Sequence, residues 1–192
     1  MAGKQAKILS QDASEQLHAY ASSTRYPLRN VVIVLLSVKA GLRAGEIAKL
    51  TWPMILDSES NVGRIIELHN KAAKKGSGRS IPIHPDLCDA LEVWADTQAA
   101  LEGSVIKSER GGPMTPGSIV VWFERAYSRI GLKGCSSHSG RRTFITRAAR
   151  LTHKAGGSLR DVQLLAGHAS IQTTQRYIDG DTDAQRRLVS LI

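Results

Sequence analysis

The stretch of sequence that most limits the possible folds runs over residues 28–40. It is apolar on nearly every side of a helix, so other elements of the chain must surround it. Pro27 stands before it, where the first turn of a helix tolerates proline, and Gly41 is placed to end it. The apolar run over residues 31–38 is far shorter than the roughly 20 residues that a membrane-spanning helix needs. We therefore expect a buried central helix and no membrane partner.

Signals for further elements recur on both sides of this segment. Ser10 is a candidate helix cap, Gly131 a helix end, and Ser158 with Asp161 a capping box. Residues 64–68 and 79–83 are strand-like, and they flank a turn-forming Lys-Lys-Gly-Ser-Gly stretch. The 192 residues thus predict a single domain over residues 1–192, mainly α with a small antiparallel β-sheet (α+β class). The other expected helices cover residues 11–22, 44–50, a segment opened by Pro85, and residues 115–131, 138–152, 158–166, 171–178 and 183–190.

Positive charge is concentrated in two parts of the chain. Lysine and arginine number 26 against 17 acidic residues, a net charge of +9. No acid lies between Glu67 and Asp86 or between Glu124 and Asp161. Such stretches suit a phosphate-binding face and predict a polyanion partner, nucleic acid first, although a solvated surface explains the charge alone equally well. The expected DNA contacts are Lys71, Arg79, Arg142, Arg147 and Arg160.

The cellular compartment is predicted from what the sequence lacks. Cys88 and Cys135 make no disulfide framework, and the first residues contain no hydrophobic signal segment. We expect a cytoplasmic protein.

Some residues suggest chemistry on a phosphodiester. Cutting DNA without a metal takes a nucleophile, cations for the non-bridging oxygens and an acid for the leaving oxygen. His138 and Arg141 stand three residues apart, on one helix face. Arg43 follows Gly41 closely, and Glu46 is placed to hold it. Arginine suits the role of a cation for the non-bridging oxygens, because its planar guanidinium can bind two phosphate oxygens at once.

His168 and Tyr177 form a further pair. Nine positions in a continuous helix are about two and a half turns, which would put the two side chains on opposite sides. Gly167 and Ser170, however, resemble a helix end and a new cap, and such a break permits both side chains to reach one site. Taken singly, each of these residues has an ordinary explanation, such as a surface arginine, a capping histidine or a packing tyrosine.

Taken together, these motifs resemble those of tyrosine recombinases, the phage integrase family. The first arginine box is Gly41-Leu-Arg43-Ala-Gly-Glu46, and the second box is His138-Ser-Gly-Arg141. The final box is Leu165-Ala-Gly-His168 followed by Tyr177, and the turn before Ile81-Pro-Ile83 is similar to a family hairpin that carries a lysine. The resemblance covers almost the whole chain and implies the catalytic-domain fold of these DNA breaking–rejoining enzymes.

The resemblance also implies roles. Tyr177 would attack the scissile phosphate to form a 3′-phosphotyrosine, while Arg43 and Arg141 stabilise the transition state. His138 would assist as acid or base, His168 would hold the phosphate and Glu46 would order Arg43. Lys74 would protonate the leaving 5′-oxygen, since a lysine ammonium with its usual pKa of about 10 is a reasonable donor; Lys75 is second and Lys71 a remote third. No metal, ATP or other cofactor is implied.

The same resemblance leaves several points open. Most family members carry an N-terminal DNA-binding domain that completes a clamp, and residues before about position 41 leave no room for it. The chain is therefore an excised catalytic domain or a short member, expected to form a tetramer on DNA. Alternatives are a type IB topoisomerase and a DNA-binding relative that has lost catalysis. A metalloenzyme is a weaker alternative, and its metal ligands would be Cys135, His138, His153 and His168.

The carboxyl-terminal tail is apolar and would pack on its own core or on a neighbouring protomer. Its apolar residues are Leu188, Val189, Leu191 and Ile192.

Overall fold

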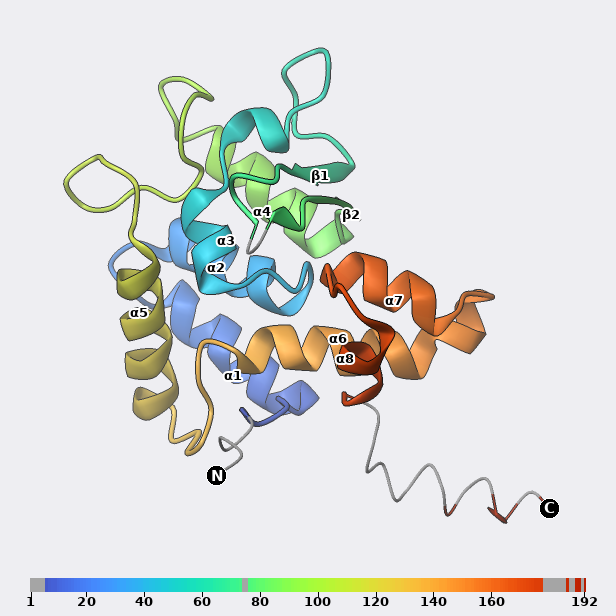
Figure 1. Cartoon of the computed structure of the whole chain (residues 1–192). Coiled ribbons are helices and arrows are strands. Elements are labelled where there is room, and N and C mark those ends of the chain that lie inside the picture. The colour runs from blue at the N-terminus through green and yellow to red at the C-terminus, as the bar shows by residue number, and fades with distance from the viewer. Residues whose placement is uncertain (1–5, 74–75, 178–185, 187–188, 191) are drawn as a thin grey trace.

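The computed structural model describes residues 6–73, 76–177, 186, 189, 190 and 192. It is mostly helical, with a small two-stranded antiparallel sheet toward one end of the molecule (Figure 1), which confirms the predicted mainly α fold with an antiparallel sheet. Most predicted boundaries agree within about two residues, but the helix expected over 171–178 ends at Gln175, and most of the tail helix expected over 183–190 lies outside the described residues. The elements are α1 (Gln11–Ser22), α2 (Pro27–Val38), α3 (Ala44–Lys49), β1 (Ile65–Leu68), β2 (Arg79–Pro82), α4 (Pro85–Ala95), α5 (Pro116–Arg129), α6 (Ser139–Leu151), α7 (Leu159–Ala166) and α8 (Ile171–Gln175).

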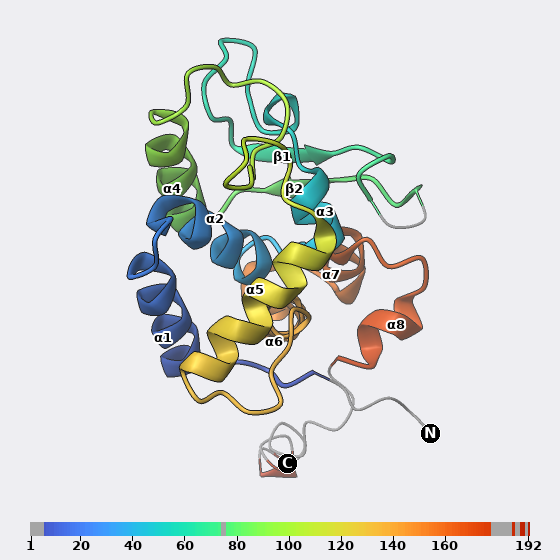
Figure 2. The ribbon, with the colours of Figure 1, turned by 90° about the vertical axis from the view of Figure 1, so that its left-hand side faces the viewer.

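Helix α2 forms the centre of the core, as its all-round apolar sequence predicts. It packs against α1, α3, α4 and α6, and Val32, Ile33 and Leu36 on it are fully buried. Figure 2 shows α5 passing in front of α6, with α1 and α4 to its left and α7 and α8 to its right. In the part of the chain that the structure describes, no helix has both the length and the apolar character to cross a membrane.

Strands β1 and β2 form an antiparallel hairpin. Ile65 pairs with Pro82 and Leu68 with Arg79, and the inward-facing Ile66 and Ile81 join the core. Strand β2 also contacts α7, so the hairpin bridges the early helices and the carboxyl-terminal part of the chain. The turn between the strands contains Lys74 and Lys75, which lie outside the described residues.

Helices α6, α7 and α8 pack together around a small second cluster that contains Ile145, Val162 and Ala166. The first turn of α6 lies directly on α2, because Gly140 has no side chain: a Cβ there would stand 2.3 Å from the hydroxyl oxygen of Ser37. This close approach brings the start of α6 to the carboxyl-terminal end of α2, where Gly41 and Arg43 follow.

Candidate active site

Residues from distant parts of the chain line one surface pocket of about 440 Å³. Five of the six residues expected to be catalytic meet in it, and the sixth, Lys74, lies outside the described residues together with its alternative Lys75. The pocket is lined by Ala6, Arg43, His138, Arg141, Arg142, His168, Thr173, Arg176 and Tyr177.

A larger hollow of about 750 Å³ lies beside the start of α5. Its lining includes Arg29, Arg110 and Arg125, but no histidine or tyrosine is among the lining residues. Tyr20 lines another hollow, of about 560 Å³, together with Arg125 and Arg129, but no histidine is among its lining residues. The pocket of about 440 Å³ is therefore the better candidate for phosphodiester chemistry, because there a tyrosine lies with arginines and two histidines.

Arg141 is the buried centre of the site, with an exposed fraction of 3%. Its Nη1 donates to the carbonyl of Gly41 at 2.7 Å and its Nη2 to the carbonyl of Ala166 at 2.5 Å. Burial and the neighbouring charge of Arg43 lower the pKa of Arg141, but an arginine remains charged at neutral pH. A fixed positive charge therefore stands at the floor of the pocket, held by carbonyls from the ends of α2 and α7.

Gly41 can offer its carbonyl to Arg141 because it is a glycine. Its φ of 65° lies in the left-handed region that side chains disfavour, and a Cβ would stand 2.4 Å from Cδ1 of Phe144. The glycine that ends the apolar helix thus also allows the loop carrying Arg43 to pass close to α6.

His168 is engaged with Arg141 rather than open to solvent. Its Nε2 lies 3.1 Å from Nη2 of Arg141, and its Nδ1 lies 3.0 Å from Oγ1 of the buried Thr174. Because a guanidinium only donates, Nε2 must accept, which leaves the ring proton on Nδ1 to bond Thr174. Burial and then the charges of Arg141, Arg43 and Arg79 lower the pKa of His168 to about 4. In this structure the ring therefore contacts Arg141, and the expected phosphate contact of His168 stays a prediction.

Tyr177 enters the site through a break in the helix, as the sequence permits. Helix α7 ends at Gly167, whose φ is 61°, and Ser170 begins α8. The chain then returns so that the rings of Tyr177 and His168 stack, with centroids 5.4 Å apart and an interplanar angle of 22°. Tyr177 is only partly buried and lines the pocket with both arginines.

Glu46 holds Arg43 in the manner expected from their spacing. Its Oε1 lies 2.6 Å from Nη1 of Arg43, and its Oε2 accepts the backbone N–H of Arg43 at 2.9 Å. The Glu46 side chain is 1% exposed. Burial alone would raise its pKa, but the hydrogen bonds and charges of Arg79 and Arg43 lower the pKa to about 2, so the carboxylate is ionised at neutral pH.

The residues expected to contact DNA divide into different groups. Arg142 lines the pocket and donates to the carbonyl of Ala6, whereas Arg147 lines a separate hollow beside α1 and α2. Lys71 and Arg160 are exposed. Arg79 differs from its prediction: its side chain is 6% exposed and ion-paired with Glu46, so it is not placed as a surface phosphate contact.

Three residues of the site were not anticipated from the sequence. Arg176 is exposed and lines the pocket next to Tyr177; its position beside the expected nucleophile was a usable signal. Thr174 bonds His168, and Gln163 donates to the backbone carbonyl of His168 at 2.9 Å. Nothing in a single sequence marks these two polar residues as buried partners.

The alternative of a metal site finds no support in the positions of its ligands. Within the described ranges no three histidine, cysteine, aspartate or glutamate side chains come close enough together to hold a metal ion. Of the four residues considered, His138 and His168 line the pocket, while Cys135 and His153 do not.

The fold is that of the catalytic domains of DNA recombinases and integrases. The crystal structure of XerA recombinase matches with a TM-score of 0.76 and 25% identity, over 96% of this chain and 64% of that chain. A lambda integrase dimer bound to a COC′ core site matches with a TM-score of 0.70 and 22% identity, over 93% of this chain and 49% of that chain.

Residues 7–183 match the profile of the Phage integrase family, and the chain belongs to that family. The family expected from the sequence is thus confirmed. Tyrosine recombinase XerC of Myxococcus xanthus is 31% identical over 162 residues, which cover 78% of this chain and 50% of the relative. Tyrosine recombinase XerC of Xylella fastidiosa (strain M23) is 27% identical over 173 residues, 89% of this chain and 55% of the relative. The chain therefore spans about half the length of the curated relatives it matches.

Proposed function

We propose that this chain is the catalytic domain of a site-specific DNA recombinase that cleaves and rejoins strands through a 3′-phosphotyrosine. The observation that carries the proposal is the shared pocket of Tyr177, Arg43 and Arg141. A phenol, two guanidinium groups and nearby imidazoles are the components that attack on a phosphodiester needs. Family membership and the curated XerC relatives support the same reaction.

In the proposed cleavage step, the oxygen of Tyr177 forms a bond to the scissile phosphorus while the bond from phosphorus to the 5′-oxygen breaks. The phenolic proton passes to a base, for which exposed His138 at the pocket edge is the candidate. The departing 5′-oxygen takes a proton from Lys74, with Lys75 as the alternative. An invading 5′-hydroxyl then reverses these steps and releases Tyr177, so the phosphotyrosine conserves the energy of the bond and no ATP is consumed.

Arg43 and Arg141 stabilise the negative charge that develops on the non-bridging oxygens in the transition state. Arg141 is fixed by two carbonyls and Arg43 by Glu46, so neither must reorganise when that charge appears. Removing one such preorganised group typically costs about a hundredfold to a thousandfold in rate.

The proposed partner is double-stranded DNA, and the proposed working assembly is a tetramer on two DNA sites in the cytoplasm. Arg142 and Arg176 at the pocket, with exposed Lys71 and Arg160, are the candidate phosphate contacts. Similar folds occur in a lambda integrase dimer bound to a core site and in a XerH recombinase bound to its difH substrate. These complexes motivate the proposal that this chain binds DNA.

A nicked suicide DNA substrate tests the proposal. The nick lets the 5′-hydroxyl fragment diffuse away, so the covalent protein–DNA product accumulates and can be counted on a denaturing gel. We expect this product with the wild-type chain and with Tyr26→Phe, a matched loss of one hydroxyl outside the pocket, but not with Tyr177→Phe. No product with the wild type, or an equal amount with Tyr177→Phe, contradicts the proposal; relaxation of supercoils without strand exchange would favour the topoisomerase alternative.

A further inference from the structure

We infer that Arg79 is a positioning residue that fixes Arg43 and the turn carrying His168, and that it does not bind DNA phosphate itself. The inference rests on the proposed function, since it assigns Arg79 a part in the same cleavage step. It replaces the surface contact that the basic sequence around Arg79 predicted.

The first line of argument is the carboxylate that Arg79 shares with Arg43. Nη1 and Nη2 of Arg79 lie 3.2 Å and 3.1 Å from the two oxygens of Glu46, a fork-like pairing that fixes the plane of the carboxylate. The same two oxygens accept the guanidinium and the backbone N–H of Arg43. The orientation of Arg43 therefore depends on Arg79 through Glu46.

The second line is the contact of Arg79 with the end of α7. Its Nε donates to the carbonyl of Leu165 at 2.8 Å. The next carbonyl, that of Ala166, holds Arg141, and His168 follows after Gly167. A Cβ on Gly167 would stand 2.9 Å from Nη1 of Arg79, so the guanidinium packs directly against this turn. The Arg79 side chain thus connects Glu46, which holds Arg43, with the end of α7, which holds Arg141.

The third line is burial. The Arg79 side chain is 6% exposed and is not among the residues that line the pocket. To reach a phosphate it would have to leave both Glu46 and Leu165, and breaking a buried pair leaves an uncompensated charge. Arg79 also begins β2, and the turn before this strand contains Lys74 and Lys75. The strand that follows the candidate acid is therefore tied to the segment that bears Arg43 and to the end of α7, whose Ala166 carbonyl holds Arg141.

The test compares Arg79→Gln with Arg64→Gln, which removes an exposed arginine from the start of the same hairpin. Single-turnover cleavage of the suicide substrate is measured at saturating DNA, and DNA affinity is measured over a range of salt concentrations. We expect Arg79→Gln to cleave about 10- to 100-fold more slowly, since small misplacements of reacting groups have effects of this size, with an unchanged salt slope. Arg64→Gln should cleave at the wild-type rate.

A direct phosphate contact would give the opposite pattern. The slope of log affinity against log salt would fall by about 0.9 and the rate at saturating DNA would stay unchanged, which would overturn the inference. Should Arg79→Gln fail to fold, Arg79→Lys replaces it, because it keeps the charge but loses the fork that holds the Glu46 carboxylate. The inference expects slower cleavage by Arg79→Lys at saturating DNA, and an unchanged rate would overturn it. If Arg79 acts through Glu46, adding Arg79→Gln to the Glu46→Gln variant should slow cleavage much less than Arg79→Gln slows the wild type. If the double variant instead loses rate by the product of the two single-variant factors, the two residues act independently and the inference is overturned.

The proposed function and this inference fail in different ways. If the wild type forms no covalent product, the proposed function is wrong, and the position of Arg79 is then tested by the side-chain ¹⁵N resonances of Arg43. These should shift in Arg79→Gln and stay in place in Arg64→Gln. If cleavage occurs but Arg79→Gln matches the wild type in rate, only the role of Arg79 is wrong.

Discussion

His168 lies between Tyr177 and Arg141: its ring stacks on the tyrosine at 5.4 Å, and its Nε2 bonds the guanidinium at 3.1 Å. A neutral imidazole can do both, because it offers a flat face and one acceptor nitrogen. The burial and positive charges that lower its pKa keep the ring neutral at physiological pH. The proposed nucleophile and a proposed transition-state cation are therefore aligned by the same ring.

Thr174→Val should slow cleavage without unfolding the chain. The exchange keeps the shape of the buried side chain but removes the acceptor of the Nδ1 proton of His168. Loss of this hydrogen bond corresponds to about 1 kcal/mol, and we expect a rate decrease of roughly fivefold in single-turnover cleavage. Thr97→Val, on an exposed threonine outside the pocket, serves as the control. An unchanged rate together with an unchanged ¹⁵N spectrum of His168 would contradict the prediction.

Glu46→Gln should change how stability depends on pH. The folded-state pKa of about 2 lies below the ordinary value of 4.5, so Glu46 contributes stability fully above pH 4.5 and loses it as the pH falls toward 2. The shift corresponds to a contribution on the order of 3 kcal/mol. Denaturant unfolding at several pH values measures this contribution. The difference in the free energy of unfolding between wild type and Glu46→Gln should be largest near neutral pH and should become smaller below pH 4.5. A difference that does not change with pH would refute the prediction.

Gly41→Ala should destabilise the protein by at least about 2 kcal/mol. The left-handed φ of 65° disfavours a side chain, and the added Cβ would collide with the ring of Phe144. Any shift of the loop also moves the carbonyl that holds Arg141, so the cleavage rate should fall as well. Gly45→Ala is the matched control, because a Cβ there meets nothing within 4 Å and alanine favours the helix by up to about 1 kcal/mol. Equal melting temperatures for the two variants would disprove the argument.

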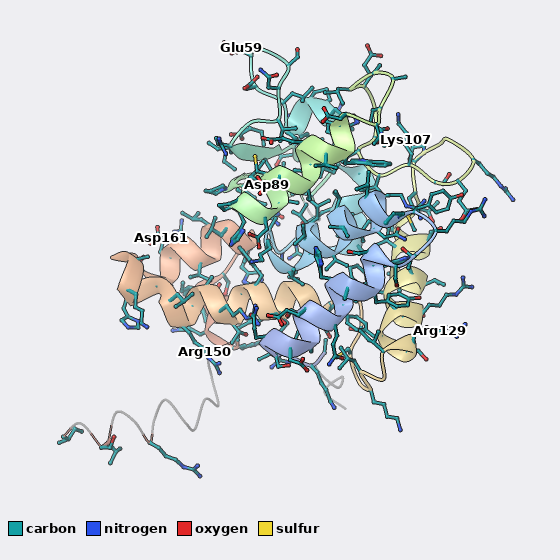
Figure 3. All side chains as sticks on the ribbon, turned by 180° about the vertical axis from the view of Figure 1, so that it is seen from behind. Glu59, Asp89, Lys107, Arg129, Arg150 and Asp161 are labelled. Carbon is teal, nitrogen blue, oxygen red and sulfur yellow. The ribbon has the colours of Figure 1, made fainter. Side chains whose placement is uncertain are left out.

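Arg176→Gln should weaken DNA binding in a salt-dependent way. The residue is exposed at the pocket beside Tyr177, and loss of one phosphate contact reduces the slope of log affinity against log salt by about 0.9. Arg129→Gln is the control: Figure 3 shows Arg129 at the end of α5, across the molecule from Asp161 on α7. Filter binding at several salt concentrations measures both, and a reduced slope in the control alone would exclude the proposed contact at Arg176.

Much of this protein is predictable from the sequence because the determining interactions are local. The apolar helix, its end at Gly41 and the capping box of Ser158 with Asp161 depend on neighbours a few positions away. The spacing of Arg43 and Glu46 predicted their ion pair for the same reason. The break between His168 and Tyr177 was visible as a glycine followed by a capping serine, but the sequence showed only that a shared site was permitted.

The tertiary structure alone decided which partners distant side chains find. Arg79 and Glu46 are 33 positions apart, and Arg141 and Gly41 are 100 apart, so their pairing depends on how the hairpin, α6 and the loop after α2 pack. A basic stretch cannot distinguish a buried arginine from an exposed one, because the carboxylate that neutralises it comes from another element. For the same reason the sequence named His168 but not its two side-chain partners, Thr174 and Arg141.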